Sequence, residues 1–226
     1  YPQTKAAGSP PVTLFSTDPA RYYTAQSGWI SPGGVAPSHE SGFVPEQGSG
    51  DVVLAPGTDE VSVPFVWTSP DGVTIRRTYT LKRGDYALRV RDDVLNTGMQ
   101  PWQGYVYRQL LRVPPVIKTG MTNPESFSFN GATWFSPQDG YQRRKFADFL
   151  EDGRVDQQTR SGWIALLQHH FFSAWIPDAN DNVTISLDAP ANGQQALVRE
   201  VGPGVNVAPG QQASTEARLY VGPKLV

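Results

Sequence analysis

The 226-residue sequence contains no cysteine, and this absence removes several kinds of chemistry at once. Without cysteine the chain has no disulfides, no thiolate nucleophile and no cysteine-ligated metal site. A cytosolic protein of this length usually has one or two cysteines, so their absence favours a protein of the cell envelope.

The sequence also lacks an excess of charge of either sign. Nineteen lysines and arginines stand against 21 aspartates and glutamates, a formal net charge of -2, and no long run has one sign. Nothing in this balance would drive binding to the phosphates of a nucleic acid. We therefore expect no nucleic-acid partner.

Long hydrophobic runs are missing as well. The opening stretch "YPQTKAAGSPP" has no apolar core of the kind that a signal peptide needs. The most apolar window, Gly162 to Asp178, is shorter than about 18 residues and is interrupted by Gln168, His169 and His170. No membrane span is expected within these residues.

What the sequence does contain is typical of an all-β protein rich in turns. It has 22 glycines and 20 prolines, with only 38% hydrophobic and 18% charged residues. Aromatic residues, at 11%, supply the apolar area for a core. No linker divides the chain, so we predict a single domain over residues 1–226, with residues 27–50, rich in Gly, Pro and Ser, as a flexible surface loop.

Alternation of apolar residues predicts the strands. It is clearest over 61–67, 73–81 and 86–92, which the turns "SPDG" and "KRGD" join into an antiparallel meander. Further strands are predicted at 12–16, 21–25, 104–113, 127–135, 163–176, 183–187, 195–201 and 213–221. Residues 140–153 are predicted either as a helix or as a strand with a loop, so the chain has at most one or two short helices.

His169 and His170 are the first candidates for chemistry. On one continuous strand over 163–176 their side chains would point to opposite faces and could not easily bind one ion. Neither H-x-H nor H-E-x-x-H spacing occurs, so no metal site is expected. Asp178 or Asp181 could orient one imidazole as an acid/base pair, but we favour a hydrogen-bonded core histidine and a second one at the rim.

Other catalytic motifs are missing, including the G-x-S-x-G elbow, the phosphate-binding P-loop and the dinucleotide-binding G-x-G-x-x-G. The aromatic residues are the remaining candidates for binding. Surface aromatics on a sheet can stack on sugars or anchor a protein partner, although more often they belong to the core. The candidate partner or ligand surface consists of Trp102, Tyr105, Tyr107, Trp134, Phe135 and Tyr141.

Five stretches, in order along the chain, resemble one family. They are "YYTAQSG" (22–28), "RTYTLKRGDYALRV" (77–90), "VLNTG" (94–98), "SGWIALLQHHFFSAWIP" (161–177) and "ARLYVGPK" (217–224). Together they are similar to the large first periplasmic domain of the YidC membrane-protein insertases of Gram-negative bacteria. The resemblance covers almost the whole chain.

The resemblance implies a β-supersandwich of two large antiparallel sheets, similar to galactose mutarotase. It also implies a non-catalytic domain in the periplasm, between the first span of an inner-membrane protein and its insertase core. Its implied partners are SecDF, the Sec translocon and nascent inner-membrane proteins, the last through chaperone-like contacts. No cofactor is implied. The family's additional N-terminal strands and its helix after the "VGP" segment are expected to be missing.

The alternative is a carbohydrate-binding or aldose-1-epimerase-like protein. Mutarotases have a histidine in a motif like N-H-x-Y-F-N-L and a glutamate base far downstream. In "HHFFSAW" His169 stands in the histidine's place, but Gln168 and Ser173 replace the asparagines. The downstream glutamates, Glu200 and Glu216, lie in no recognisable motif, so the interaction domain is the preferred reading.

Overall fold

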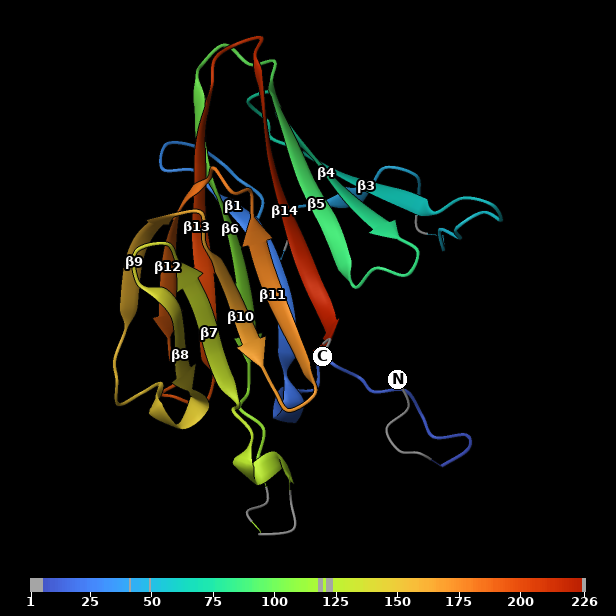
Figure 1. Ribbon diagram of the computed structural model, residues 1–226. Coiled ribbons are helices and arrows are strands. Elements are labelled where there is room, and N and C mark those ends of the chain that lie inside the picture. Colours follow the sequence, from blue (N-terminus) through green and yellow to red (C-terminus); the bar gives the residue numbers. More distant parts are fainter. Residues whose placement is uncertain (1–5, 41, 49, 118–119, 121–123, 225–226) are drawn as a thin grey trace.

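The described residues form two antiparallel sheets, of five and nine strands, whose inner faces pack against each other (Figure 1). The computed structural model describes residues 6–40, 42–48, 50–117, 120 and 124–224. Within these residues the helices are three short 3-10 turns, η1 Pro19–Arg21, η2 Pro124–Phe127 and η3 Phe146–Asp148. The predicted all-β class and the two large sheets are therefore confirmed.

The five-stranded sheet has the order β1-β6-β13-β12-β9. Its strands are β1 Tyr23–Ile30, β6 Trp102–Arg112, β13 Ala196–Val207, β12 Asn182–Asp188 and β9 Val155–Arg160. The two longest, β6 and β13, lie side by side, with a register shift between Val201 and Gly204.

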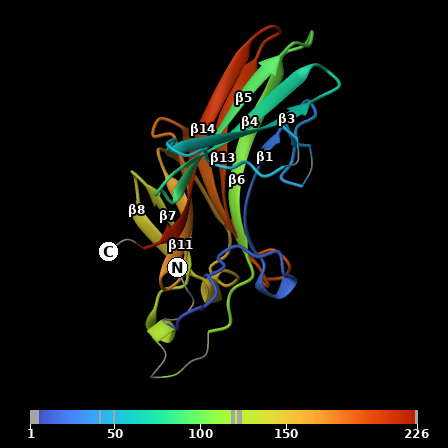
Figure 2. The ribbon, with the colours of Figure 1, turned by 90° about the vertical axis from the view of Figure 1, so that its right-hand side faces the viewer.

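The nine-stranded sheet has the order β2-β3-β4-β5-β14-β11-β10-β7-β8. Its strands are β2 Val44–Pro45, β3 Glu60–Thr68, β4 Val73–Lys82, β5 Ala87–Asn96, β14 Gln212–Pro223, β11 Phe171–Pro177, β10 Trp163–Leu167, β7 Gly131–Ser136 and β8 Gly140–Lys145. In the view of Figure 2, β4 and β5 of this sheet lie beside β6 and β1 of the smaller one.

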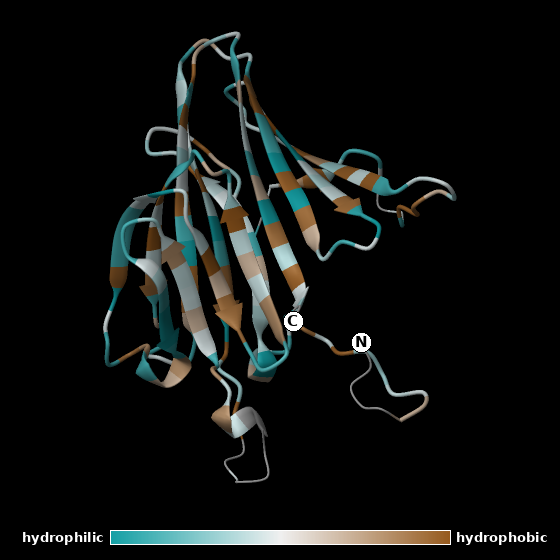
Figure 3. Ribbon diagram, viewed as in Figure 1, coloured by the Kyte–Doolittle hydropathy of each residue, from teal (hydrophilic) through white to brown (hydrophobic). Residues whose placement is uncertain are grey.

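The meander β3-β4-β5 follows the predicted alternation. Gly72 in the "SPDG" turn has a φ of 89°, and a Cβ at this position would lie 2.8 Å from the backbone nitrogen of Gly98. Only glycine fits such a turn without strain. The hydropathy colours of Figure 3 alternate along these strands, as expected for strands with one buried face.

Two apolar clusters fill the space between the sheets. The larger cluster includes Leu110, Ile164 and Ile185, and its members come from both sheets. The smaller cluster includes Trp29, Ile75 and Val106. All of these except Trp29, at 3%, are at most 1% exposed. Burial of this apolar area supplies most of the stabilisation, at roughly 25 cal/mol per Å².

The prediction of one strand over 163–176 is wrong. The chain forms two strands, β10 and β11, joined by a turn at 168–170 in which the Gln168 amide N–H donates to the Phe171 carbonyl. The turn reverses the chain, so Ile164 and Trp175 are paired, and both are core residues. A continuous strand would have placed these two on opposite faces.

The histidine pair therefore lies in a turn, and its rings do not diverge. The ring centroids of His169 and His170 are 3.9 Å apart, in an edge-to-face arrangement. The His169 Nδ1 contacts the Ser128 hydroxyl, and the His170 carbonyl accepts a hydrogen bond from the Lys224 N–H. The pair closes the end of a hairpin.

Several other predicted boundaries change. Residues 27–30, placed in the loop 27–50, complete β1, and 44–45 form β2. The predicted strand 12–16 is reduced to one isolated bridge, between Ser16 and Tyr23. Residues 140–153 form β8 followed by η3, which is the strand-and-loop alternative, and β9 was not predicted.

Candidate functional site

The six aromatic residues predicted as a binding surface do not lie together. Trp102, Tyr105 and Tyr107 are on β6 of the smaller sheet, while the other three are on β7 and β8 of the larger one. Trp102, Tyr107 and Trp134 are each only 7% exposed. Whether any of the six contacts a partner stays a prediction, and the accessible members on the larger sheet are Phe135 and Tyr141.

The most prominent polar feature is a band of buried side chains between the two apolar clusters. It consists of Ser27, Arg77, Asp92, Arg108 and Glu200, which we call the polar layer. Each layer residue stands two positions from a core residue on its strand, as Asp92 does between Val90 and Val94. Side chains two apart on a strand share a face, so all five are directed inward.

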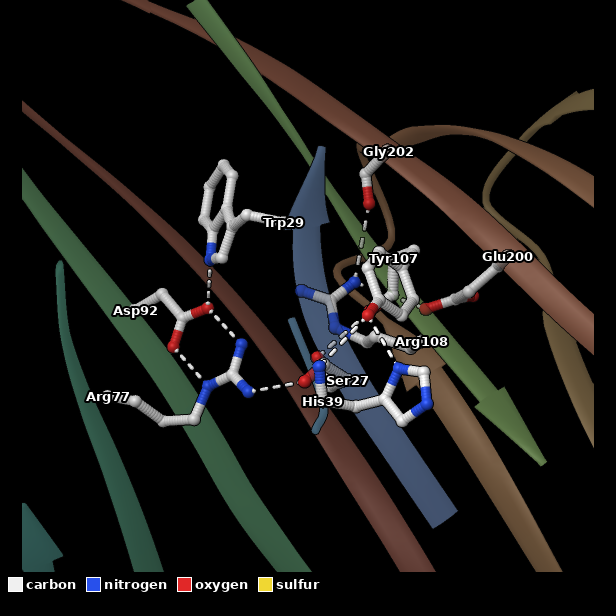
Figure 4. A network of polar contacts seen from close by, with 9 residues as sticks. All are labelled: Ser27, Trp29, His39, Arg77, Asp92, Tyr107, Arg108, Glu200 and Gly202. Carbon is white, nitrogen blue, oxygen red and sulfur yellow. Dashed lines mark hydrogen bonds and ion pairs between the residues drawn. The ribbon is translucent and has the colours of Figure 1, made fainter. Parts of the chain in front are cut away.

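Arg77 and Asp92 form the centre of the polar layer (Figure 4). The Arg77 Nε and Nη2 donate to the two oxygens of Asp92, each at 2.7 Å, and Nη1 donates to the Ser27 carbonyl at 2.9 Å. The Trp29 indole N–H donates to the same carboxylate at 2.7 Å. Such a bidentate pair compensates much of the cost of burying both charges.

Arg108 and Glu200 form the second ion pair of the layer, 3.1 Å apart, on neighbouring strands β6 and β13. Arg108 also donates to the Gly202 carbonyl (Figure 4). The Glu200 Oε2 is buried and has no hydrogen-bond partner among the described residues. Burial raises the pKa of Glu200 to about 7, although Arg108 opposes the shift.

His39 is fixed from the outside by Tyr107, which points away from the layer because it neighbours Arg108 on β6. The His39 backbone N–H donates to the Tyr107 hydroxyl at 3.0 Å, and Nδ1 lies 2.7 Å from the same oxygen (Figure 4). A pocket of about 290 Å³ lies beside His39, Arg77 and Tyr79. Because Arg77 is committed to Asp92 and Ser27, this pocket contains no arginine aimed at a ligand.

An apolar hollow of about 320 Å³ lies on the outer face of the larger sheet. Ala165 and Ala174, which are paired on β10 and β11, form its floor, because small side chains leave space between larger neighbours. We call it the outer hollow, and it is lined by Thr133, Tyr141, Trp163, Ala165, Leu167, Phe172, Ala174, Ile176 and Lys224. Phe135 stacks on Trp163 at its side, with ring centroids 6.2 Å apart.

A mutarotase-like catalytic pair is not formed by the expected residues. His169 is in the β10-β11 turn, Glu200 is fully buried, and Glu216 lines a separate pocket near Asp178. Asp178 also cannot orient His170, because the seven residues of β11 separate them by roughly 20 Å at the usual rise per residue. The acid/base alternative is therefore wrong for that carboxylate.

Two further kinds of site or segment are absent from the described part of the chain. No three His, Asp or Glu side chains there are grouped to hold a metal ion. No helix in the same residues is long and apolar enough to span a membrane.

Sequence reasoning missed the polar layer, although its signal was present. Arg77 and Asp92 occupy positions that the alternation assigns to the inner face, alongside Ile75 and Val90. A charge at such a position indicates a buried ion pair as readily as an exposed strand.

The fold is similar to that of known sugar-processing proteins. The chain is similar to a galactose mutarotase-related enzyme from Lactobacillus acidophilus, with a TM-score of 0.52 and 11% identity over 85% of this chain and 79% of that one. It is also similar to the GH36 α-galactosidase AgaA from Geobacillus stearothermophilus, with a TM-score of 0.54 and 12% identity over 88% of this chain and 30% of that one. The architecture is thus the β-supersandwich of galactose mutarotase-like proteins, as the resemblance implied.

The sequence comparisons define the family. The model of the YidC periplasmic domain matches residues 1–226, and the chain belongs to this family. It is 53% identical to the membrane protein insertase YidC of Xanthomonas euvesicatoria pv. vesicatoria, over 226 residues and the whole of this chain. It is 52% identical over 227 residues to that of Stenotrophomonas maltophilia. The chain spans 39% of the length of these relatives.

Proposed function

We propose that this domain is a non-catalytic interaction module of a bacterial membrane-protein insertase, located in the periplasm. The observation that carries the proposal is the family match over the entire chain, to relatives that are named insertases. In this role the domain contacts SecDF and the Sec translocon, and it binds nascent inner-membrane segments as a chaperone does.

The outer hollow supports a role in protein contacts. It offers apolar side chains at the surface, its lining includes the predicted aromatic residue Tyr141, and a second one, Phe135, stacks on the lining residue Trp163. Tyr141 is 54% exposed and its ring packs at 6.0 Å from that of Trp163. Aromatic side chains next to an apolar recess are the usual anchors of protein–protein contacts.

The arrangement of the polar layer supports the proposal that the domain is non-catalytic. Its charged groups are turned into the interior and bonded to one another, whereas a catalytic acid or base must reach a substrate. Glu200 has a raised pKa but no exposed surface. The buried position of Glu200 therefore fits a structural role and not a catalytic one.

Co-purification tests the contact. The full-length insertase carrying Tyr141→Asp should retain less SecDF than the unsubstituted protein, because a carboxylate at the hollow cannot enter an apolar interface without losing its hydration. Tyr105→Asp is the matched control, a tyrosine on the other sheet. Equal recovery of SecDF with both variants would remove the outer hollow from the proposal.

Polarimetry tests the absence of catalysis. The anomerisation of α-D-glucose or α-D-galactose in the presence of the purified domain should match the buffer rate. A rate that increases with protein concentration and falls in His169→Ala would establish the epimerase alternative instead.

A further inference from the structure

A pocket of about 530 Å³ opens at one end of the sandwich, where β1 begins, β6 ends and the β10-β11 turn contributes Gln168. Its lining residues are Thr13, Leu14, Ser16, Ala20, Arg21, Tyr23, Arg112, Val113, Pro114, Pro115, Val116 and Gln168. None of them belongs to the polar layer or to the outer hollow.

Arg112 is the buried charged residue among those that line this pocket. It stands two positions after Leu110 on β6, so its side chain is directed inward, and it is only 9% exposed. It is the third buried arginine, after Arg77 and Arg108. Those two have the carboxylates of Asp92 and Glu200, whereas no carboxylate of the described residues lies within 4.0 Å of Arg112.

The contacts of Arg112 do not compensate its charge. Its Nη2 donates to the amide oxygen of Gln168 at 2.8 Å, and its guanidinium carbon lies 4.5 Å from the centre of the Tyr23 ring. Its Nη1 is buried, with no partner among the described residues. Desolvation lowers the pKa of Arg112, as expected for a buried cation that lacks an anion. Burying an unpaired charge is costly, so such a group favours a bound counter-charge.

We propose that the Arg112 pocket binds a phosphate group, with Arg112 as its principal ligand. Gln168 accepts from Nη2 of Arg112, so one of the five guanidinium N–H donors is occupied by a neutral partner and the positive charge is left without an anion. A phosphate carries more negative charge than a carboxylate and has more acceptor oxygens, so it can accept from two arginines at once. The pocket offers Arg112 in its wall and, at its rim, the exposed Arg21, whose Nε is held by Asp18.

The remaining walls indicate what the phosphate is attached to. Leu14, Pro114 and Pro115 are apolar, and the prolines have no backbone N–H to offer. This wall fits a short apolar or glycerol-like group beside the anion. The phosphate could come from a lipid headgroup or from a free phosphate compound, which share this chemistry and which the experiment separates.

The test measures binding to the purified chain, residues 1–226, by isothermal titration and by the shift in melting temperature. The probes are inorganic phosphate, glycerol 3-phosphate, and vesicles of phosphatidylglycerol or phosphatidylcholine, each at fixed ionic strength. We expect saturable binding of at least one phosphate monoester or of phosphatidylglycerol vesicles, weakened at least about tenfold in Arg112→Gln, as for the loss of a charge-assisted hydrogen bond. The control Arg154→Gln, at an exposed arginine, should bind like the unsubstituted chain.

Each outcome decides the proposal. Binding of the small phosphates identifies a free phosphate ligand, whereas binding of phosphatidylglycerol vesicles alone identifies a lipid headgroup. If Arg112→Gln does not fold, Arg21→Gln replaces it, with an expected loss of about threefold because Arg21 stands at the rim. Acetate that binds as tightly as phosphate, binding that is unchanged in the arginine variants, or no binding of any probe would overturn the proposal.

Discussion

Three arginines, Arg77, Arg108 and Arg112, are buried in the sandwich, and the residues around them differ. Arg77 donates three hydrogen bonds, two to the Asp92 carboxylate and one to the Ser27 carbonyl, and Arg108 has the carboxylate of Glu200. Arg112 has an amide and two aromatic rings. Because the cost of burying a charge depends on its partners, the same substitution should have different effects at these positions.

Arg77→Met should lower the free energy of unfolding by about 3–5 kcal/mol, since it leaves the carboxylate of Asp92 buried and unpaired. Arg112→Met, in the absence of ligand, should change it by less than about 1 kcal/mol, because no carboxylate is left behind. Urea unfolding of both variants measures the difference. A loss at Arg112 as large as that at Arg77 would mean that a partner of Arg112 has been overlooked.

The raised pKa of Glu200 predicts that the free energy of unfolding depends on pH. Its pKa is about 7 in the folded protein, against 4.5 for an ordinary glutamate, so the folded state holds the proton more tightly. The stabilisation by the neutral acid is therefore fully present below pH 4.5 and is lost as the pH rises through 7. The loss amounts to about 3 kcal/mol between the two limits.

Urea unfolding between about pH 4 and pH 8 should show this loss for the natural sequence and not for Glu200→Gln. Titrating groups that do not interact with Glu200 are shared by both proteins and cancel in the difference, whereas the charge of Asp181 contributes to the raised pKa of Glu200 and belongs to the measured effect. A pH dependence that is identical in the two proteins would show that Glu200 is ionised in the folded state at the same pH as in the unfolded chain.

At the scale of elements, edge strand β1 is protected by the chain itself. The backbone of Tyr23 pairs with Ser16, the Trp29 N–H donates to the Pro37 carbonyl, and the Ser27 carbonyl accepts from Arg77. These contacts occupy outward-facing polar groups that would otherwise pair with another strand.

The position of His39, in the segment between β1 and β2, is held by hydrogen bonds to the Tyr107 hydroxyl. Tyr107→Phe removes the hydroxyl that accepts the His39 N–H, so the His39 amide should exchange with solvent at least about tenfold faster, as for the loss of about 1.4 kcal/mol of protection. Hydrogen exchange measures this rate. The control is Tyr105→Phe, whose hydroxyl accepts only from the exposed Gln103 side chain, and it should leave the His39 amide unchanged. An unchanged rate in Tyr107→Phe would show that other contacts hold the segment.

Most elements could be predicted from alternation, and the exceptions have physical causes. The β10-β11 turn was missed because "QHH" contains no glycine, proline or asparagine, and the flanking segments are apolar except for Ser173. Residues 27–30 were assigned to the loop because they directly precede the turn-forming sequence "SPGG", although they are the last residues of β1. β9, "VDQQTR", lies at a sheet edge and has a single apolar residue, so its period is weak.

At the scale of the whole molecule, the candidate site was the least predictable part. Family membership could be inferred from the "LKRGDY" hairpin and the "GWIALLQHHFFSAWIP" segment. The polar layer, the outer hollow and the Arg112 pocket each join residues that are far apart in the chain, so no local pattern reveals them. Trp102 and Trp134 were proposed for the surface, but packing between the sheets buries both.

The central claim is that the domain acts through protein contacts made on the outer hollow. Site-specific photocrosslinking in cells tests it most directly, with the crosslinker placed in the full-length insertase at Tyr141 or Phe172, and at Tyr105 as the reference position on the other sheet. Adducts with SecDF or nascent membrane proteins are expected from the first two positions and none from Tyr105. Adducts only within the insertase's own chain, or equal adducts from all three positions, would contradict it.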